Sequence, residues 1–357
     1  MAGGDALLRR SEGADEAAIQ ELFRAVFRRE RSAAHWRWKF TETPYPSQQV
    51  SLAVAKEGGA LLGHYAVVPV PINLMGRRLL GAQSVDTMVH PDAQGQGLFE
   101  QLGSDCYARM RGAGVALVYG LPNRNSYPGF MRKLGWKRIG FLDSYTLRLS
   151  VLEPLRQILR ARSLARAGDL AYRSALAVRL EAQHALLRRR VGGNVVFRAE
   201  PEAPAGADAL WEALRSYEVI SLWKDRAYLA WRYDRHPSRR FEYGLLERDG
   251  QLEALAVVET SHPVEVRLCE LLVRRRDVRL GRLLVNEIAR RHRSRGRRWL
   301  TFAGIDSGFF ASVFAGFEAE PNFELVWGAR AFGDPALEEL LPRRENWTVT
   351  LGDTDLV

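Results

Sequence analysis

The chain reads Val85-Asp86-Thr87-Met88-Val89-His90-Pro91-Asp92-Ala93-Gln94-Gly95-Gln96-Gly97-Leu98-Phe99 where a predicted strand, residues 79–89, passes into a predicted helix, residues 98–111. Two glycines in the turn let the backbone bend tightly and let a ligand approach without a Cβ in the way. The helix that follows presents free N–H groups and a positive dipole end, which together suit phosphate oxygens. The spacing does not fit the dinucleotide fingerprint or the P-loop, because no Gly-x-Gly-x-x-Gly or Gly-Lys-Ser/Thr pattern is present.

Strands and helices alternate on both sides of this turn. Residues 50–56 and 61–70 are apolar and β-branched and are joined through a glycine pair, which predicts a hairpin. The wholly apolar residues 115–120 are typical of a central strand in a covered sheet. We expect a short helix at residues 125–134, and a strand at residues 136–149 that completes the first sheet.

The second half of the chain repeats this order of elements. A hairpin over residues 243–259, a strand over 266–273, a helix over 281–291 and an apolar strand over 299–303 follow one another as in the first half. Two copies of one α/β unit are the economical explanation. The expected domains are residues 1–150, a basic helical connector and linker at residues 151–204, and a second copy at residues 205–357.

The turn and a second motif resemble the GNAT superfamily of acyltransferases. The family's coenzyme A motif is a strand, a Pro-Asp/Glu pair and Arg/Gln-x-x-Gly-x-Gly/Ala at the start of a helix, and Gln94 and Gly97 match it. Phe99 stands where the family prefers a small residue. The second motif, Asn…Phe-Tyr-x-Lys-x-Gly-Phe, is matched by residues 123–136, with Met131 in place of the tyrosine.

The resemblance implies a fold, a cofactor and a set of binding residues. The fold class is α/β, as two tandem mixed sheets flanked by helices. The first sheet would splay to receive the pantetheine of acetyl-CoA or another acyl-CoA. Its expected contacts are backbone groups of Met88 and Val89, the pyrophosphate turn of Gln94, Gly95, Gln96, Gly97, Leu98 and Phe99, and the arm contacts Asn123 or Asn125. In the second copy only Gly281 survives from the turn, so we expect no coenzyme there.

The catalytic residues are less clearly marked. Acyl transfer to an amine needs a base for the amine proton and an acid for the leaving thiolate. Many relatives use a tyrosine where this chain has Met131, so we consider Tyr127, one helical turn earlier, as the acid. Asp86 falls where relatives carry a glutamate base. Each has a structural alternative: Tyr127 as a packing residue, and Asp86 as a hydrogen-bonded polar residue at a strand edge.

Charge is concentrated in the connector. The chain has a net charge of +10, and residues 151–190 hold nine arginines against Glu153, Asp169 and Glu181, a net charge of +6. Leucines at helical spacing indicate basic amphipathic helices. They either dock on the folded units or contact an anionic surface such as a membrane.

Other features narrow the class of protein. Arginine-rich composition is typical of a bacterial chain of high GC content. The chain has no run of 18 apolar residues and its start lacks the pattern of a signal peptide, so we expect the cytoplasm. Cys106 and Cys269 are expected to be buried thiols rather than a disulfide. The seven histidines lack metal-ligand spacing, so no metal is expected.

Three functions remain open. The first is an N-acyltransferase that moves an acyl group, acetyl in the simplest case, to a primary amine of a small molecule, sugar or peptide. The second is a Fem-type aminoacyltransferase, which uses aminoacyl-tRNA; the intact coenzyme turn argues against this nucleic-acid partner. The third is a non-catalytic GNAT-like binding module, which the methionine at position 131 would suit.

Overall fold

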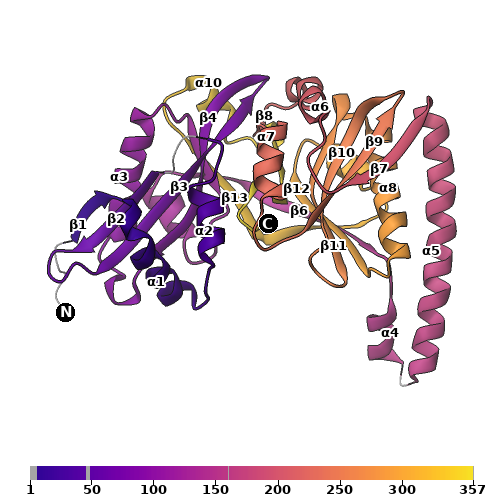
Figure 1. Cartoon of the computed structure of the whole chain (residues 1–357), viewed down its shortest axis with the longest axis horizontal. Coiled ribbons are helices and arrows are strands. Elements are labelled where there is room, and N and C mark those ends of the chain that lie inside the picture. The colour runs from indigo at the N-terminus through magenta and orange to yellow at the C-terminus, as the bar shows by residue number, and fades with distance from the viewer. Residues whose placement is uncertain (1–5, 46–48, 160, 357) are drawn as a thin grey trace. The chain divides into compact units, whose positions relative to one another are not determined.

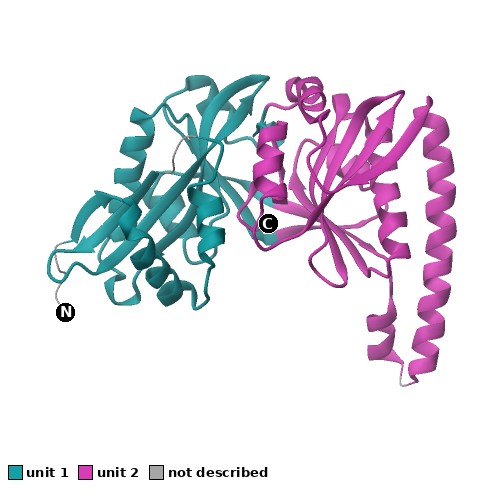
Figure 2. Ribbon diagram, viewed as in Figure 1, with its two compact units in different colours: residues 1–141, 220–223, 323–346 teal, residues 142–219, 224–322, 347–357 magenta. Residues whose placement is uncertain are grey.

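The structure is a computed structural model that describes residues 6–45, 49–159 and 161–356. The first five residues, on which the signal-peptide expectation depends, lie outside it. The chain forms two compact units, shown in two colours in Figure 2. Unit 1 comprises residues 1–141, 220–223 and 323–346, and unit 2 comprises residues 142–219, 224–322 and 347–357.

Unit 1 contains a mixed sheet in the order β1-β2-β3-β4-β5-β13. Neighbouring strands are antiparallel except for β4 and β5, which are parallel. A short strand, β8 (Ile220–Leu222), also pairs with one end of β3. The strands are β1 (Ala6–Arg10), β2 (Gln49–Ala55), β3 (Leu61–Leu74), β4 (Arg77–Val89), β5 (Leu117–Gly120) and β13 (Glu318–Ala331), of which residues 323–331 belong to this unit.

Amphipathic helices cover this sheet. The helix α1 (Glu16–Phe27) packs on β3 and β4 through Ile19, Leu22 and Phe23, and α2 (Ala33–Phe40) follows it. The helix α3 (Leu98–Gly112) packs on β2 and β3 through the expected row of apolar residues. That row is Leu98, Leu102, Cys106 and Met110. A π-helical turn, η3 (Gly129–Lys133), and α10 (Pro335–Leu340) complete the unit.

Unit 2 repeats the same sheet strand for strand, in the order β7-β9-β10-β11-β12-β6 (Figure 1). Again only the fourth and fifth strands, β11 and β12, are parallel. This confirms the tandem α/β fold that the sequence predicts. The strands are β7 (Val195–Glu200), β9 (Phe241–Arg248), β10 (Gln251–Glu259), β11 (Glu265–Val273), β12 (Trp299–Ile305), β14 (Trp347–Thr350) and β6 (Lys137–Arg148), of which residues 142–148 belong to this unit.

The basic connector belongs to unit 2. It forms α4 (Leu152–Ile158) and the 30-residue α5 (Arg162–Val191), which packs beside α8 (Val278–Ser294) (Figure 1). Leu176 and Leu180 of α5 are buried in the core of this unit. The remaining helices are α6 (Ala207–Leu214), α7 (Arg226–Leu229) and α9 (Phe309–Val313).

Each unit takes its sixth strand from the other half of the sequence. Residues 143–148 of β6 pair with β12 in unit 2, whereas the sequence analysis assigned residues 136–149 to the first sheet. The sixth strand of unit 1 is instead β13, which pairs with β5 through residues 328–331. The expected boundaries at residues 150 and 204 therefore do not coincide with the edges of the compact units.

Candidate active site

The two parallel strands of unit 1 separate at the predicted site. β4 and β5 pair only through Gly81, Ala82 and Gln83, opposite residues 117–119. β5 ends at Gly120, while β4 runs six residues beyond Gln83 to Val89. Within the part of the chain that the structure describes, residues 84–89 pair with β3 alone. Their other edge has backbone donors and acceptors available for a ligand that carries amides, and Met88 and Val89 lie on this segment.

A β-bulge re-aims the strand beside this edge. The register with β3 shifts between the pairs His64↔Met88 and Ala66↔Val85, so two residues of β4 oppose one of β3. Asp86 lies in the bulge with φ of 48°, a conformation that few residues other than glycine adopt. The bulge turns the Asp86 side chain toward α2 and the segment before it.

The glycine turn forms an open cradle in front of α3. After a short 3-10 turn, η2 (Pro91–Ala93), Gly95 and Gly97 have φ of 78° and 76°. No atom lies within 4 Å of a Cβ placed on Gly95, and Gly97 is the N-cap of α3 with no side chain capping the helix. The first N–H groups of the helix are therefore available to phosphate oxygens.

Side chains around the turn have structural partners. The amide groups of Gln94 and Gln96 donate to the carbonyl oxygens of Val89 and Asp92, at 3.4 and 3.5 Å. Leu98 is buried, and Phe99 packs edge-on against rings of the core. Any contact of Leu98 and Phe99 with a pyrophosphate would thus come from their backbone.

Asp86 is a buried, ion-paired carboxylate. Arg31 donates to one oxygen and Lys39 Nζ to the other, at 3.0 Å for the lysine. The three side chains are between 5% and 10% exposed. Burial by itself would raise the pKa of Asp86, but the charges of Lys39 and Arg31 outweigh it and hold the pKa well below its usual range. Such a carboxylate is a weak base.

His64 lies beside Asp86 and is neutral. Its Nδ1–H donates to the backbone carbonyl oxygen of Asp86 at 2.7 Å. Burial lowers the pKa of His64 to about 4, so the ring carries no charge at pH 7. The ring thereby supports the bulge through its hydrogen bond.

The second motif forms a capped turn. Asn123 Oδ1 accepts from the backbone N–H groups of Asn125 and Ser126, both at 3.0 Å, so its oxygen is already engaged. The Asn125 side chain is exposed. Tyr127 donates its N–H to the Asn123 carbonyl, and its phenolic oxygen has no hydrogen bond to any described residue. Met131 packs on the core of unit 1. The predicted coenzyme and acid roles of these residues remain predictions.

Sequence reasoning missed a buried hydrogen-bonded network below the strand edge. Tyr65 and Tyr107 share a hydrogen bond of 2.7 Å between their hydroxyls, which also accept from Ser84 Oγ and Trp136 Nε1 respectively. Burial raises the pKa of both tyrosines. These phenols keep their protons and tie β3 and β4 to α3. No spacing in the sequence connects Tyr65, Ser84 and Tyr107, since they lie on β3, β4 and α3.

The corresponding place in unit 2 is filled by the chain itself. β11 and β12 pair as far as Leu268 and Phe302, and beyond that point β14 pairs with β12 at Gly304 and Ile305. The next turn brings Gly352 so close to β11 that a Cβ on it would lie 2.7 Å from the Cys269 carbonyl oxygen. The C-terminal segment thus occupies the position that a pantetheine arm would need.

The start of α8 in unit 2 also differs from that of α3, because a side chain caps it. Its N-cap is Asp277, whose carboxylate accepts the N–H of Arg279 at 2.8 Å. The hydrogen bond from the Arg279 side chain lowers the pKa of Asp277, which is therefore negative where a phosphate would bind. Both features support the expectation that unit 2 holds no coenzyme.

Comparisons with known proteins agree with this fold. Residues 8–139 match the family model described as an acetyltransferase (GNAT) domain. No curated protein matches the sequence. Among solved structures, a GCN5-related N-acetyltransferase from Kribbella flavida is 14% identical, with a TM-score of 0.63 over 96% of this chain and 74% of that one.

Two further structures are similar. A conserved protein from Enterococcus faecalis V583, described as a probable N-acyltransferase, is 15% identical, with a TM-score of 0.61 over 92% of this chain and 73% of that one. A tandem GNAT protein from the clavulanic acid biosynthesis pathway is 17% identical, with a TM-score of 0.51 over 92% of this chain and 99% of that one. The molecule therefore has the tandem GNAT fold. Within it, residues 8–139 are the part that matches the acetyltransferase (GNAT) domain model.

The residues that the structure describes contain no candidate membrane span and no candidate metal cluster. No helix among them is long and apolar enough to cross a membrane. No group of three or more histidine, cysteine, aspartate or glutamate side chains that could hold a metal ion occurs in those same residues. Cys106 and Cys269 are both buried free thiols, as expected.

Proposed function

We propose that unit 1 is an acyl-CoA-dependent N-acyltransferase, with acetyl-CoA as the simplest donor and a primary amine as acceptor. One observation carries the proposal: the unpaired edge of β4 leads directly into an uncapped helix start with two left-handed glycines. The edge suits the amides of pantetheine and the helix start suits its pyrophosphate. In unit 2 Asp277 caps the helix start, and Gly352 packs against the strand beyond the last β11–β12 pair.

The reaction would take place beside the bulge. The amine nitrogen attacks the thioester carbonyl, a C–N bond forms and the C–S bond breaks. The amine loses a proton, and the leaving thiolate gains one. A backbone N–H on the free edge of β4 is suited to hold the oxygen of the tetrahedral intermediate. Tyr127, whose hydroxyl has no hydrogen bond within the described chain, is the proposed proton donor to the thiolate.

The structure changes the role that we propose for Asp86. Its carboxylate would have to leave two buried cations before it could take a proton from an amine. We therefore propose that Asp86 is a positioning residue. It stabilises the β-bulge of β4 and fixes the positions of the Arg31 and Lys39 side chains beside it. The alternative, in which Asp86 is the general base, is tested by Asp86→Asn.

The test is a screen of acyl-CoAs against a panel of amines, with released thiol as the readout and coenzyme binding measured by calorimetry. The proposal expects one coenzyme per chain and acceptor-dependent thiol release. Coenzyme binding without thiol release for any amine would favour the binding module, which the methionine at position 131 suits. Activity that requires aminoacyl-tRNA and no coenzyme A would favour the Fem-type alternative.

A further inference from the structure

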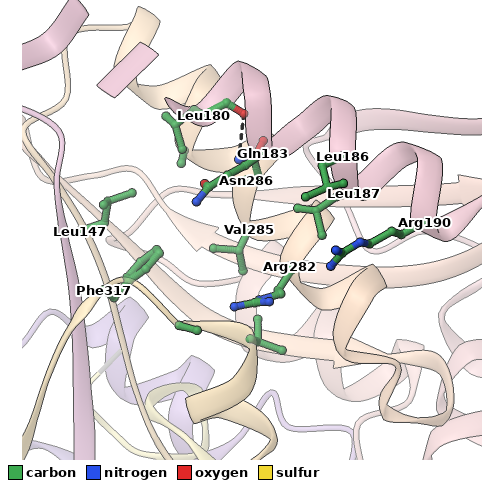
Figure 3. Close-up of a pocket in the computed structure, with 13 residues that line it drawn as sticks. Leu147, Leu180, Gln183, Leu186, Leu187, Arg190, Arg282, Val285, Asn286 and Phe317 are labelled. Atoms are coloured by element: carbon green, nitrogen blue, oxygen red, sulfur yellow. Dashed lines mark hydrogen bonds between the residues drawn. The ribbon is translucent and has the colours of Figure 1, made fainter. Parts of the chain in front are cut away.

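A pocket lies entirely on residues of unit 2. It opens along the seam between α5 and α8 and has a volume of ≈ 190 Å³ (Figure 3). Leu180 and Leu187 of α5, Val285 of α8 and Phe317 form an apolar wall. Proteins leave few such spaces between packed helices, and those with apolar walls and a few polar groups are typical of ligand sites.

Two cations face this pocket without an anion. Figure 3 shows Arg190 and Arg282 extending toward it from opposite helices. Neither side chain has an ion pair or hydrogen bond to the residues that the structure describes. The nearby acids are engaged elsewhere: Glu181 pairs with Arg290, and Glu287 pairs with Arg290 and His184. Like charges that face one space repel each other, so an anion between them would be stabilised.

One buried polar group in the wall also lacks a partner. Asn286 is 5% exposed, and its amide nitrogen donates to the Leu180 carbonyl at 3.2 Å. Its Oδ1 is buried and accepts no hydrogen bond from any described residue. Buried polar atoms are nearly always paired, so a donor from outside the chain is expected here.

We propose that this pocket binds a short aliphatic carboxylate that carries one hydroxyl or amide N–H. The carboxylate would lie between Arg190 and Arg282, the chain would lie on the apolar wall, and the donor would reach Asn286. At about 30 Å³ for each water-sized group, the space holds roughly six such groups. A short acid therefore fits, and a long fatty acid does not. The proposal is independent of the activity of unit 1.

The test is calorimetric titration of the full chain with 3-hydroxyhexanoate and hexanoate. We expect both acids to bind, and the hydroxy acid more tightly because it supplies the missing donor. Arg190→Gln with Arg282→Gln should weaken binding by about tenfold or more, the range for hydrogen bonds to a charged group. The matched control is Arg189→Gln, an exposed neighbour on α5 that does not line the pocket, and it should bind as the parent does.

Several outcomes would overturn the proposal. They are the absence of binding by either acid, equal binding of hexylamine, and unchanged affinity in the double variant with its melting temperature preserved. Equal affinity for the two acids would remove Asn286 from the site. If an alkyl phosphate of the same length bound tenfold more tightly, the ligand would be a phosphate ester and not a carboxylate.

Discussion

Replacing Asp86 by asparagine would test whether this residue holds the bulge or takes a proton. The change keeps the shape of the side chain and removes its charge, so Arg31 and Lys39 lose their shared anion inside the protein. Removing one partner from a buried ion pair costs about 3–5 kcal/mol. For a domain of this size each kcal/mol shifts the melting temperature by about 2–4 °C. Even the lower cost, about 3 kcal/mol, therefore predicts that the melting temperature of the variant falls by roughly 6–12 °C.

The pH dependence gives a second measurement on the same variant. Because the folded pKa of Asp86 is depressed, its contribution to stability is complete above the unfolded pKa and is lost only as the pH falls through the folded value. The difference in melting temperature between parent and variant should therefore be constant from pH 5 to pH 9. Asp92→Asn is the matched control, since that carboxylate is 85% exposed and should melt like the parent.

Calorimetric melting and thiol-release kinetics of the Asp86→Asn variant decide between the two roles. A variant that melts within 2 °C of the parent would refute the structural role. If it also lost turnover by about 10²–10⁴-fold with coenzyme affinity unchanged, Asp86 would be the base after all. A variant that melts lower yet retains turnover within about threefold at a permissive temperature would exclude a base at this position.

Three further predictions can be tested by calorimetry, melting and sedimentation. Gly97→Glu puts a side chain and a negative charge at the N-cap of α3, where the backbone has a left-handed conformation, so calorimetry should show that coenzyme binding is lost. The control Gly59→Glu, at another left-handed glycine in an exposed turn, should bind coenzyme normally. Gly352→Ala places a Cβ against a backbone carbonyl, so the melting temperature should fall, and an unchanged value would mean that the segment is loosely held. The outer face of α5, which carries Leu164 and Val178 at 61% and 71% exposure on an arginine-rich helix, should bind anionic vesicles at low salt and release them at high salt. No pelleting at low salt would exclude that contact.

The parts of this fold that could be predicted from sequence are those with local causes. The glycine turn, the helical row of apolar residues in α3 and the hairpin glycines each act within a few residues, and all three appear where expected. The sequence also predicts, from a local change that leaves only Gly281 of the turn, that the second copy binds no coenzyme, and this stays a prediction. The structure adds two observations that favour it. Asp277 caps the start of α8 with its carboxylate, and Gly352 of the C-terminal segment packs against β11.

What could not be predicted depends on pairing between distant residues. The alternation of residues 137–148 indicates a strand but does not say which neighbour it pairs with, so its place in unit 2 was not foreseen. Arg31 and Lys39 lie 55 and 47 residues from Asp86, and no spacing connects them. The buried aromatic residues Trp36, Trp38 and Phe40 hold α2 against the unit and so place Lys39 beside Asp86.

The two units together favour a structural role for the acid in the bulge. Glu270 lies three residues before the end of β11, as Asp86 does before the end of β4, and each lies beside a shift in strand register. Glu270 is fully buried and accepts from Lys224 Nζ at 2.5 Å, as Asp86 accepts from Lys39. In unit 2 the C-terminal segment packs against β11 at Gly352, yet a lysine-paired acid lies in the same place. Since a lysine-paired acid lies beside the register shift in both units, we infer that its common function is to stabilise the distorted strand.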